Sequence, residues 1–219
     1  GGRLLLRAQR SAAEVAVSTL DSTVSGARQV AVEAVKVFEG IATLNATGTS
    51  SGTTLTLDTV KADNTAFASN HAAIRTRLGR DGDASFHLLS GVEVRAPGDL
   101  SLAQDWNLAS ARAGGEAGAL TLIAGGDLKL DANLSDGFSV ATPFSGSAPA
   151  TLLADASWSY RLVGGADAAA ADPLATVMDA GDVRLAAGKL VRSGSGDIDV
   201  AAGRDIVLAS NTSAIYTAG

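Results

Sequence analysis

The chain has 219 residues, of which 46% are apolar and 18% are charged, with no cysteine and a formal net charge of −6. The length fits one large domain with a sizeable core, and the absence of cysteine excludes disulfide frameworks, thiolate zinc sites and thiol nucleophiles. The acidic balance argues against a nucleic-acid binder, which needs a basic face for phosphates, and no apolar run is long enough to cross a membrane as a helix.

Short bursts of alternation with a period of two residues run along the whole chain. Each burst places an apolar pair on one face of a strand and small or charged residues on the other, so the pattern predicts an all-β chain of very short strands. In chain order the pairs are Val15/Val17, Val30/Val32, Val35/Val37, Leu55/Leu57, Phe86/Leu88, Val92/Val94, Leu100/Leu102, Trp106/Leu108, Leu120/Leu122, Leu128/Leu130, Phe138/Val140, Trp158/Tyr160, Val183/Leu185, Ile198/Val200 and Ile206/Leu208.

A Gly-Asp dipeptide stands before several of these strands. The copies are Gly98-Asp99, Gly126-Asp127, Gly181-Asp182, Gly196-Asp197 and the degenerate Arg204-Asp205. Glycine allows a turn with positive φ, and the aspartate carboxylate can accept a hydrogen bond from the backbone two residues further on, so we expect the five aspartates to cap turns. Repeated strand–turn units favour a β-solenoid over a sandwich, whose strands are longer.

One helix is expected over residues 65–78, where Phe67, His71, Ile74 and Leu78 share one face. Asp63 and Asn64 stand before it as N-cap candidates, and Gly79 can end it. With its flanks this segment forms the first of three predicted loop excursions, 63–80. The other two are 141–151, which contains Pro143 and Pro149, and the alanine-rich 164–180.

No residue pattern predicts catalysis. His71 lies on the face of the predicted helix and His87 points outward from a strand, so packing and surface roles are favoured over metal binding. The segment Gly48-Thr49-Ser50-Ser51-Gly52 spells a nucleophile elbow, but a strand follows it instead of the helix that the motif requires. Trp106, Trp158 and Tyr160 alternate with leucines and are expected in the core instead of on a sugar-binding surface.

Two acidic clusters are candidate calcium ligands, Asp81 with Asp83 and Asp197 with Asp199. The calcium-binding nonapeptide repeat requires Gly-x-Asp in phase, which Gly196-Asp197-Ile198 does not supply. Turn capping is therefore the favoured role of these aspartates, and no cofactor is expected.

Several segments resemble the filamentous haemagglutinin-like family of secreted bacterial exoproteins. They are LLLRA (4–8), VSGARQVAVEAVKVFEG (24–40), GVEVRAPGDLSLAQDWNLASAR (91–112), LLADASWSYRLVGGAD (152–167) and GDVRLAAGKLVRSGSGDIDVAAGRDIVLASNTSAIYTAG (181–219). The resemblance implies a right-handed parallel β-helix over residues 1–219, exported through an outer-membrane two-partner secretion transporter to the cell surface. The chain lacks the Asn-Pro-Asn-Gly type secretion motif of that family, so an interior or distal segment of a longer exoprotein is expected.

The leading hypothesis is a non-enzymatic, adhesive segment of a surface filament. Its loop excursions would contact glycans or proteins of a host or neighbouring cell. The alternatives are a polysaccharide lyase or hydrolase, and a ligand-free shaft of a contact-dependent toxin carrier. Because the end strands of a stack of coils are open edges, end-to-end self-association is also expected.

Overall fold

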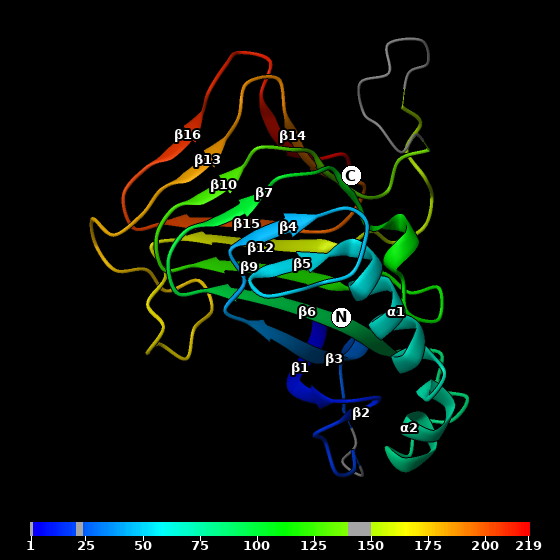
Figure 1. Cartoon of the computed structure of the whole chain (residues 1–219). Helices are drawn as coiled ribbons and strands as arrows, with labels where there is room; N and C mark the ends of the chain where they lie inside the picture. Colours follow the sequence, from blue (N-terminus) through cyan, green and yellow to red (C-terminus); the bar gives the residue numbers. More distant parts are fainter. Residues whose placement is uncertain (1, 21–23, 140–149) are drawn as a thin grey trace.

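The computed structural model describes residues 2–20, 24–139 and 150–219 and is mostly β (Figure 1). Sheet 1 consists of β1 (Gly2–Ser11), β2 (Glu14–Val15), β3 (Ala27–Glu39), β6 (Phe86–Ala96), β9 (Ala119–Ala124), β12 (Ser159–Gly164) and β15 (Ile198–Ala202). Sheet 2 consists of β4 (Thr43–Asn45), β5 (Thr54–Thr56), β7 (Leu100–Leu102), β10 (Leu128–Leu130), β13 (Val183–Leu185) and β16 (Ile206–Leu208). Sheet 3 consists of β8 (Trp106–Asn107), β11 (Leu134–Ser135), β14 (Leu190–Ser193) and β17 (Ala214–Thr217).

Equivalent apolar residues stack on one another across neighbouring strands. In sheet 2, Leu102 pairs with Leu130, Leu130 with Leu185, and Leu185 with Leu208, all in parallel register. The inward members of such rows build one large core cluster between the sheets. This packing explains why the alternation recurs so often in the sequence, since each apolar pair covers the pair below it.

The prediction of a single right-handed β-helix (β-solenoid) over residues 1–219 is wrong. Within the described residues the strands form three separate sheets of seven, six and four strands, and no closed solenoid. The strands are also very unequal, since β3 has 13 residues whereas β8 and β11 have two each. Alternation indicates which face of a strand is buried, but it does not indicate whether neighbouring sheets close into one coil. The observed architecture is a multi-sheet arrangement flanked by helices.

The predicted helix over 65–78 is also corrected, because two helices occupy this region. They are α1 (Leu57–Ala68) and α2 (His71–Arg77). Thr56 caps α1 with its hydroxyl, whereas Asn64, expected as a cap, is fully buried in the middle of the helix. Gly79 follows α2 with a φ of 67°, as a helix stop requires. The last apolar residue of one β alternation is thus the first residue of a helix.

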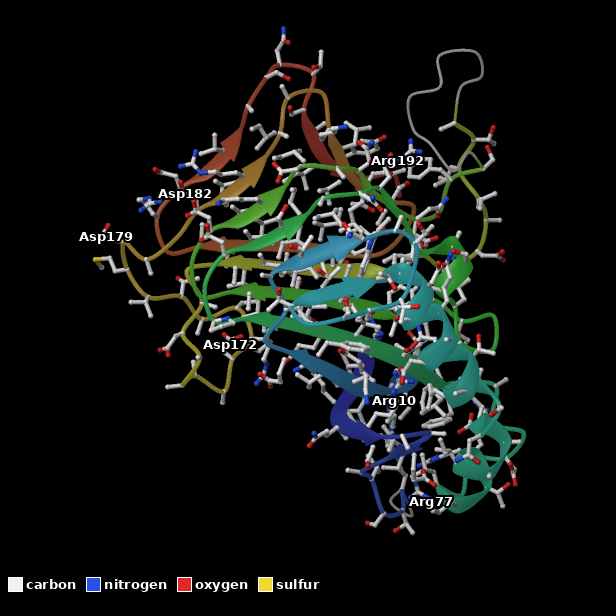
Figure 2. All side chains as sticks on the ribbon, in the orientation of Figure 1. Arg10, Arg77, Asp172, Asp179, Asp182 and Arg192 are labelled. Atoms are coloured by element: carbon white, nitrogen blue, oxygen red, sulfur yellow. The ribbon has the colours of Figure 1, made fainter. Side chains whose placement is uncertain are left out.

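Two arginines hold the helices and the N-terminal segment together. Arg10 of β1 is 2% exposed, forms an ion pair with Asp63 of α1 and lies 4.5 Å above the Phe67 ring. Arg77 of α2 donates to the backbone oxygen of Ser18 at 2.9 Å and pairs with Glu14 at 2.6 Å. Figure 2 shows both arginines on the side of the molecule where the helices lie beside β1.

The prediction that Trp106, Trp158 and Tyr160 belong to the core is confirmed, since each is at most 1% exposed. All three belong to the large cluster between the sheets, and a second, smaller cluster lies under β1, β3 and the helices. Among the described residues, no helix has the length and hydropathy that crossing a membrane requires.

The three predicted excursions have different outcomes. Residues 63–80 are mainly helical and pack on the fold. Of 141–151, residues 141–149 lie outside the described part of the chain. Residues 164–180 leave the C-terminal end of β12 and include Met178, which is 85% exposed.

Candidate functional site

Four of the five predicted capping aspartates form a ladder across sheet 2. An Oδ1 atom of Asp99 accepts from the Asp127 amide at 2.9 Å, Asp127 accepts from the Asp182 amide at 3.0 Å, and Asp182 accepts from the Asp205 amide at 3.2 Å. The carboxylates of Asp99, Asp127 and Asp182 therefore link successive strands instead of capping the backbone of their own turns as expected, and Asp205 contributes its amide. Figure 2 shows Asp182 at the side of the molecule where β13 begins. Asp197 stands apart from the ladder, at the start of β15 in sheet 1.

Cationic side chains also bind the carboxylates of this ladder. Lys129 Nζ lies 2.6 Å from Asp99 Oδ2, and Arg204 Nε lies 2.6 Å from Asp182 Oδ1, while Arg184 also pairs with Asp182. The hydrogen bond from Arg204 lowers the pKa of Asp182, and the hydrogen bond from Lys129 lowers the pKa of Asp99. These contacts favour a structural role for the ladder.

The calcium candidates show no shared metal site. Asp83 Oδ1 accepts from the amide and the hydroxyl of Ser85, at 2.9 and 2.6 Å. In the described ranges no group of three or more acidic or histidine side chains converges as a metal ligand set would.

The strongest candidate site is the outward face of sheet 1, which we call the sheet-1 trough. Three hollows lie along it, with volumes of about 610, 520 and 390 Å3. Residues of β1, β3, β6, β9 and β12 contribute to them, and Asp197, directly before β15, lines the second hollow. With strands about 4.8 Å apart, six strands give the trough a length of roughly 24 Å.

A network of arginines and glutamates occupies the middle of the trough. Glu33 and Glu93 are each only 1% exposed although they point away from the core. Arg161 binds Glu33 through two nitrogens, each 3.1 Å from a carboxylate oxygen. Arg7 contacts both glutamates, at 3.1 Å to Glu33, and Arg95 Nε donates to Glu93 at 2.6 Å. Three arginines therefore cover two carboxylates, and we call this set the charge network.

A glycine makes the network possible. A Cβ atom on Gly91 of β6 would lie 3.0 Å from Glu33 Cγ and 3.1 Å from Glu33 Oε1. Because glycine has no side chain, the Glu33 carboxylate can lie across β6. There it meets Arg161 of β12, whose guanidinium also lies 3.4 Å from the Thr121 hydroxyl of β9. Burial by itself would lower the pKa of Arg7, but the hydrogen bond to Glu93 and the charge of Glu33 outweigh burial and raise it.

The largest hollow lies at the C-terminal ends of the sheet-1 strands. Arg7, Arg95 and Glu39 line one side of it, and residues 166–173 of the third excursion line the other. Hydrogen bonds hold this excursion against the sheet, for example from the Ala166 amide to the Ala124 oxygen at 2.9 Å. Figure 2 shows Asp172 on this excursion, beside the ends of the sheet-1 strands. One predicted contact loop thus forms a wall of the trough.

The two histidines lie in different surroundings. His87 lies in the second hollow, where its Nδ1 is 3.1 Å from Glu116 Oε2. His71 packs edge-on against Phe67, with 4.6 Å between ring centroids, and its buried Nε2 has no hydrogen-bond partner among the described residues. Burial, followed by the charges of Arg10 and Arg75, lowers the pKa of His71.

The serine of the elbow-like segment has a turn role. Ser50 lies between β4 and β5, where its hydroxyl accepts from the Thr56 amide at 2.9 Å and lies 2.7 Å from the Thr59 hydroxyl. A strand follows it, as the sequence predicts, and its contacts organise the cap of α1.

Sequence reasoning missed the charge network. Its signal is present, since outward positions carry arginines on β1 and β12 and glutamates on β3 and β6, but the pairs become visible only once the register is known. Comparison with known proteins adds no assignment: no family model matches the chain, and no curated protein or solved structure matches it.

Proposed function

We propose that the chain is a non-enzymatic, adhesive segment of a large secreted bacterial surface protein of the filamentous haemagglutinin-like kind. In this proposal the parent chain leaves the cell through an outer-membrane two-partner secretion transporter and acts at the cell surface. The family resemblance supports the assignment, and the sheet-1 trough supplies the contact surface. A scaffold that holds a long polar trough fits a binding module.

The observation that carries the proposal is the trough beside the third excursion. Arg95 and Glu39 keep 48% and 68% of their side chains exposed, so they can donate to and accept from a ligand's hydroxyl groups. Pro97 and Ile123 add apolar surface to the same hollow. A mixture of hydrogen-bonding groups and small apolar surfaces suits a glycan of a host or neighbouring cell.

A glycan and matrix-protein array probed with the labelled chain tests the proposal. We expect saturable binding to a defined glycan, reduced at least about tenfold by Arg95→Gln because the substitution removes the guanidinium donors from the hollow. Lys61→Gln is the matched control, since Lys61 lies on α1 and pairs with Asp58 away from the trough. A blank array from folded protein would contradict the proposal and favour a ligand-free shaft.

A polysaccharide lyase or hydrolase is the second candidate, because the trough brings carboxylates and arginines together as such chemistry requires. The contacts weigh against it. Glu33 and Glu93 are each engaged by two arginines and almost fully covered, so neither can exchange a proton with a substrate without breaking an ion pair. Release of reducing ends or unsaturated products from acidic polysaccharides would favour the enzyme.

A further inference from the structure

Two of the three hollows in the sheet-1 trough lie at opposite ends of the same strands. On β6, His87 and Leu89 line the second hollow, whereas Arg95 lines the largest one. On β12, Ser159 lines the second hollow, and Ala166, just past the end of the strand, lines the largest one. The strands are parallel, and Figure 1 shows β3, β6, β9 and β12 side by side, so a line between these two end hollows runs along the strands.

The third hollow, of about 390 Å3, continues the largest one towards the second. It shares charged side chains with the largest hollow and also includes Glu93 of β6. Alternate residues of β6 face the trough, so Gly91 stands between Glu93 and Leu89 of the second hollow. The Glu33 side chain lies beside Gly91 and is only 1% exposed. A ligand that crosses from one end hollow to the other therefore passes over Gly91 and the charge network.

The path along the strands is long compared with a single sugar ring. From His87 to Arg95 the chain takes eight residue steps along β6, which span about 26 Å at about 3.3 Å per residue. A disaccharide can occupy one end hollow, whereas an extended hexasaccharide reaches from one end hollow to the other. The geometry therefore fits a linear polymer better than a short terminal sugar.

The charges along the trough disfavour an acidic ligand. The three arginines of the charge network are bound by its two glutamates, and Arg112 of the second hollow is bound by Asp136. Among the described arginines that line the hollows, Arg3 alone has no carboxylate partner. Several lining carboxylates form no ion pair with a described cation, namely Asp155, Asp167, Asp172 and Asp197. A uronate or sulfate group would meet these carboxylates as a like charge, whereas a neutral hydroxyl group can donate to them.

We propose that the sheet-1 trough binds a linear, uncharged glycan that lies along the strands and occupies both end hollows at once. This inference rests on the glycan-binding function proposed above, and it adds the class, the length and the direction of the ligand. Leu89 gives the second hollow an apolar surface, as Pro97 and Ile123 do in the largest one. Once one end of the polymer is bound, the contact at the other hollow is intramolecular, which raises the affinity.

Calorimetric titration of the 219-residue chain with size-graded oligosaccharides tests the proposal. The probes are neutral linear oligomers of glucose, mannose and N-acetylglucosamine, from the disaccharide to the octasaccharide, and galacturonate oligomers of the same lengths. For at least one neutral series we expect one hexasaccharide per chain, bound at least about thirtyfold more tightly than the disaccharide, and a plateau for longer oligomers. We expect the galacturonate oligomers to bind more weakly than that neutral series at every length, because they bring like charges to the unpaired aspartates.

A variant in the second hollow separates one continuous ligand from two independent sites. Gln29 of β3 lines that hollow and is only partly buried. Gln29→Ala should weaken hexasaccharide binding about three- to tenfold, because it removes an amide that can bind the far end of the polymer. Gln104→Ala is the matched control, since Gln104 lies just after β7 of sheet 2, outside the residues that line the three hollows.

The inference and the proposed function can fail separately. Equal affinities for the disaccharide and the hexasaccharide would overturn the inference while the chain remains a glycan-binding module. Tighter binding of galacturonate oligomers has the same meaning. So does wild-type affinity of Gln29→Ala for the hexasaccharide while its circular dichroism shows a folded chain. If none of these oligomers binds, the inference is wrong, and the glycan array alone then decides the proposed function.

Discussion

Replacing Glu33 with glutamine is expected to lower the free energy of unfolding by about 2–4 kcal/mol. Glutamine fills a similar volume but removes the charge, and it leaves Arg161 and Arg7 without their shared partner. Removing one side of a buried ion pair costs roughly 3–5 kcal/mol. The two arginine side chains are 17% and 31% exposed, so they can turn partly to water, which reduces the expected loss.

Urea unfolding followed by tryptophan fluorescence measures this change, because Trp106 and Trp158 are both buried in the large core. Glu39→Gln is the matched control. Glu39 is 68% exposed and pairs with Arg95 at 3.4 Å, so its loss should cost less than about 0.5 kcal/mol. Equal unfolding midpoints for the two variants, at unchanged denaturant dependence, would refute the view that the charge network is a buried ion-pair set.

Three further changes probe other parts of the fold. Gly181→Ala should cost about 1–3 kcal/mol in thermal or urea unfolding, because its Cβ would lie 2.2 Å from a backbone oxygen, whereas Gly98→Ala meets nothing within 4 Å and should be nearly neutral. Burial, followed by the charges of nearby arginines, lowers the pKa of His71 in the folded chain. The unfolded chain therefore binds the proton more readily, and the free energy of unfolding should fall as pH drops below about 6.5. Unfolding midpoints measured at several pH values should show a smaller loss in His71→Gln and the full loss in His87→Gln. A hydrogen bond from Arg204 lowers the pKa of Asp182 in the folded chain, so its stabilisation is present above the unfolded pKa of about 3.9 and is lost as pH falls towards the lower folded value. Asp182→Asn should be less stable than wild type at pH 7 and should lose less stability than wild type between pH 5 and 3. An unchanged dependence of stability on acid pH would contradict the role of the ladder.

The sequence by itself determined where most strands lie and which way they face. Alternation is a local property, so Leu100, Leu128 and Val183 could be assigned to inward strand positions without knowledge of their partners. The same reasoning placed Trp158 and Tyr160 in the core, where the structure has them. Gly79 marked a helix end for an equally local reason, because its backbone adopts a positive φ.

Only the tertiary structure decided how these strands combine. Whether sheets close into one coil depends on contacts between distant segments, and the predicted β-helix failed at that level. Helix α1 begins at Leu57, inside an apparent β alternation, because its buried face packs against the fold. The charge network joins Glu33 to Arg161, 128 residues away, and Gly91 leaves the space between them. A local sequence pattern cannot predict this pairing. The sequence gives the charge and the volume of each side chain, but the register of the whole sheet decides which side chains lie close together.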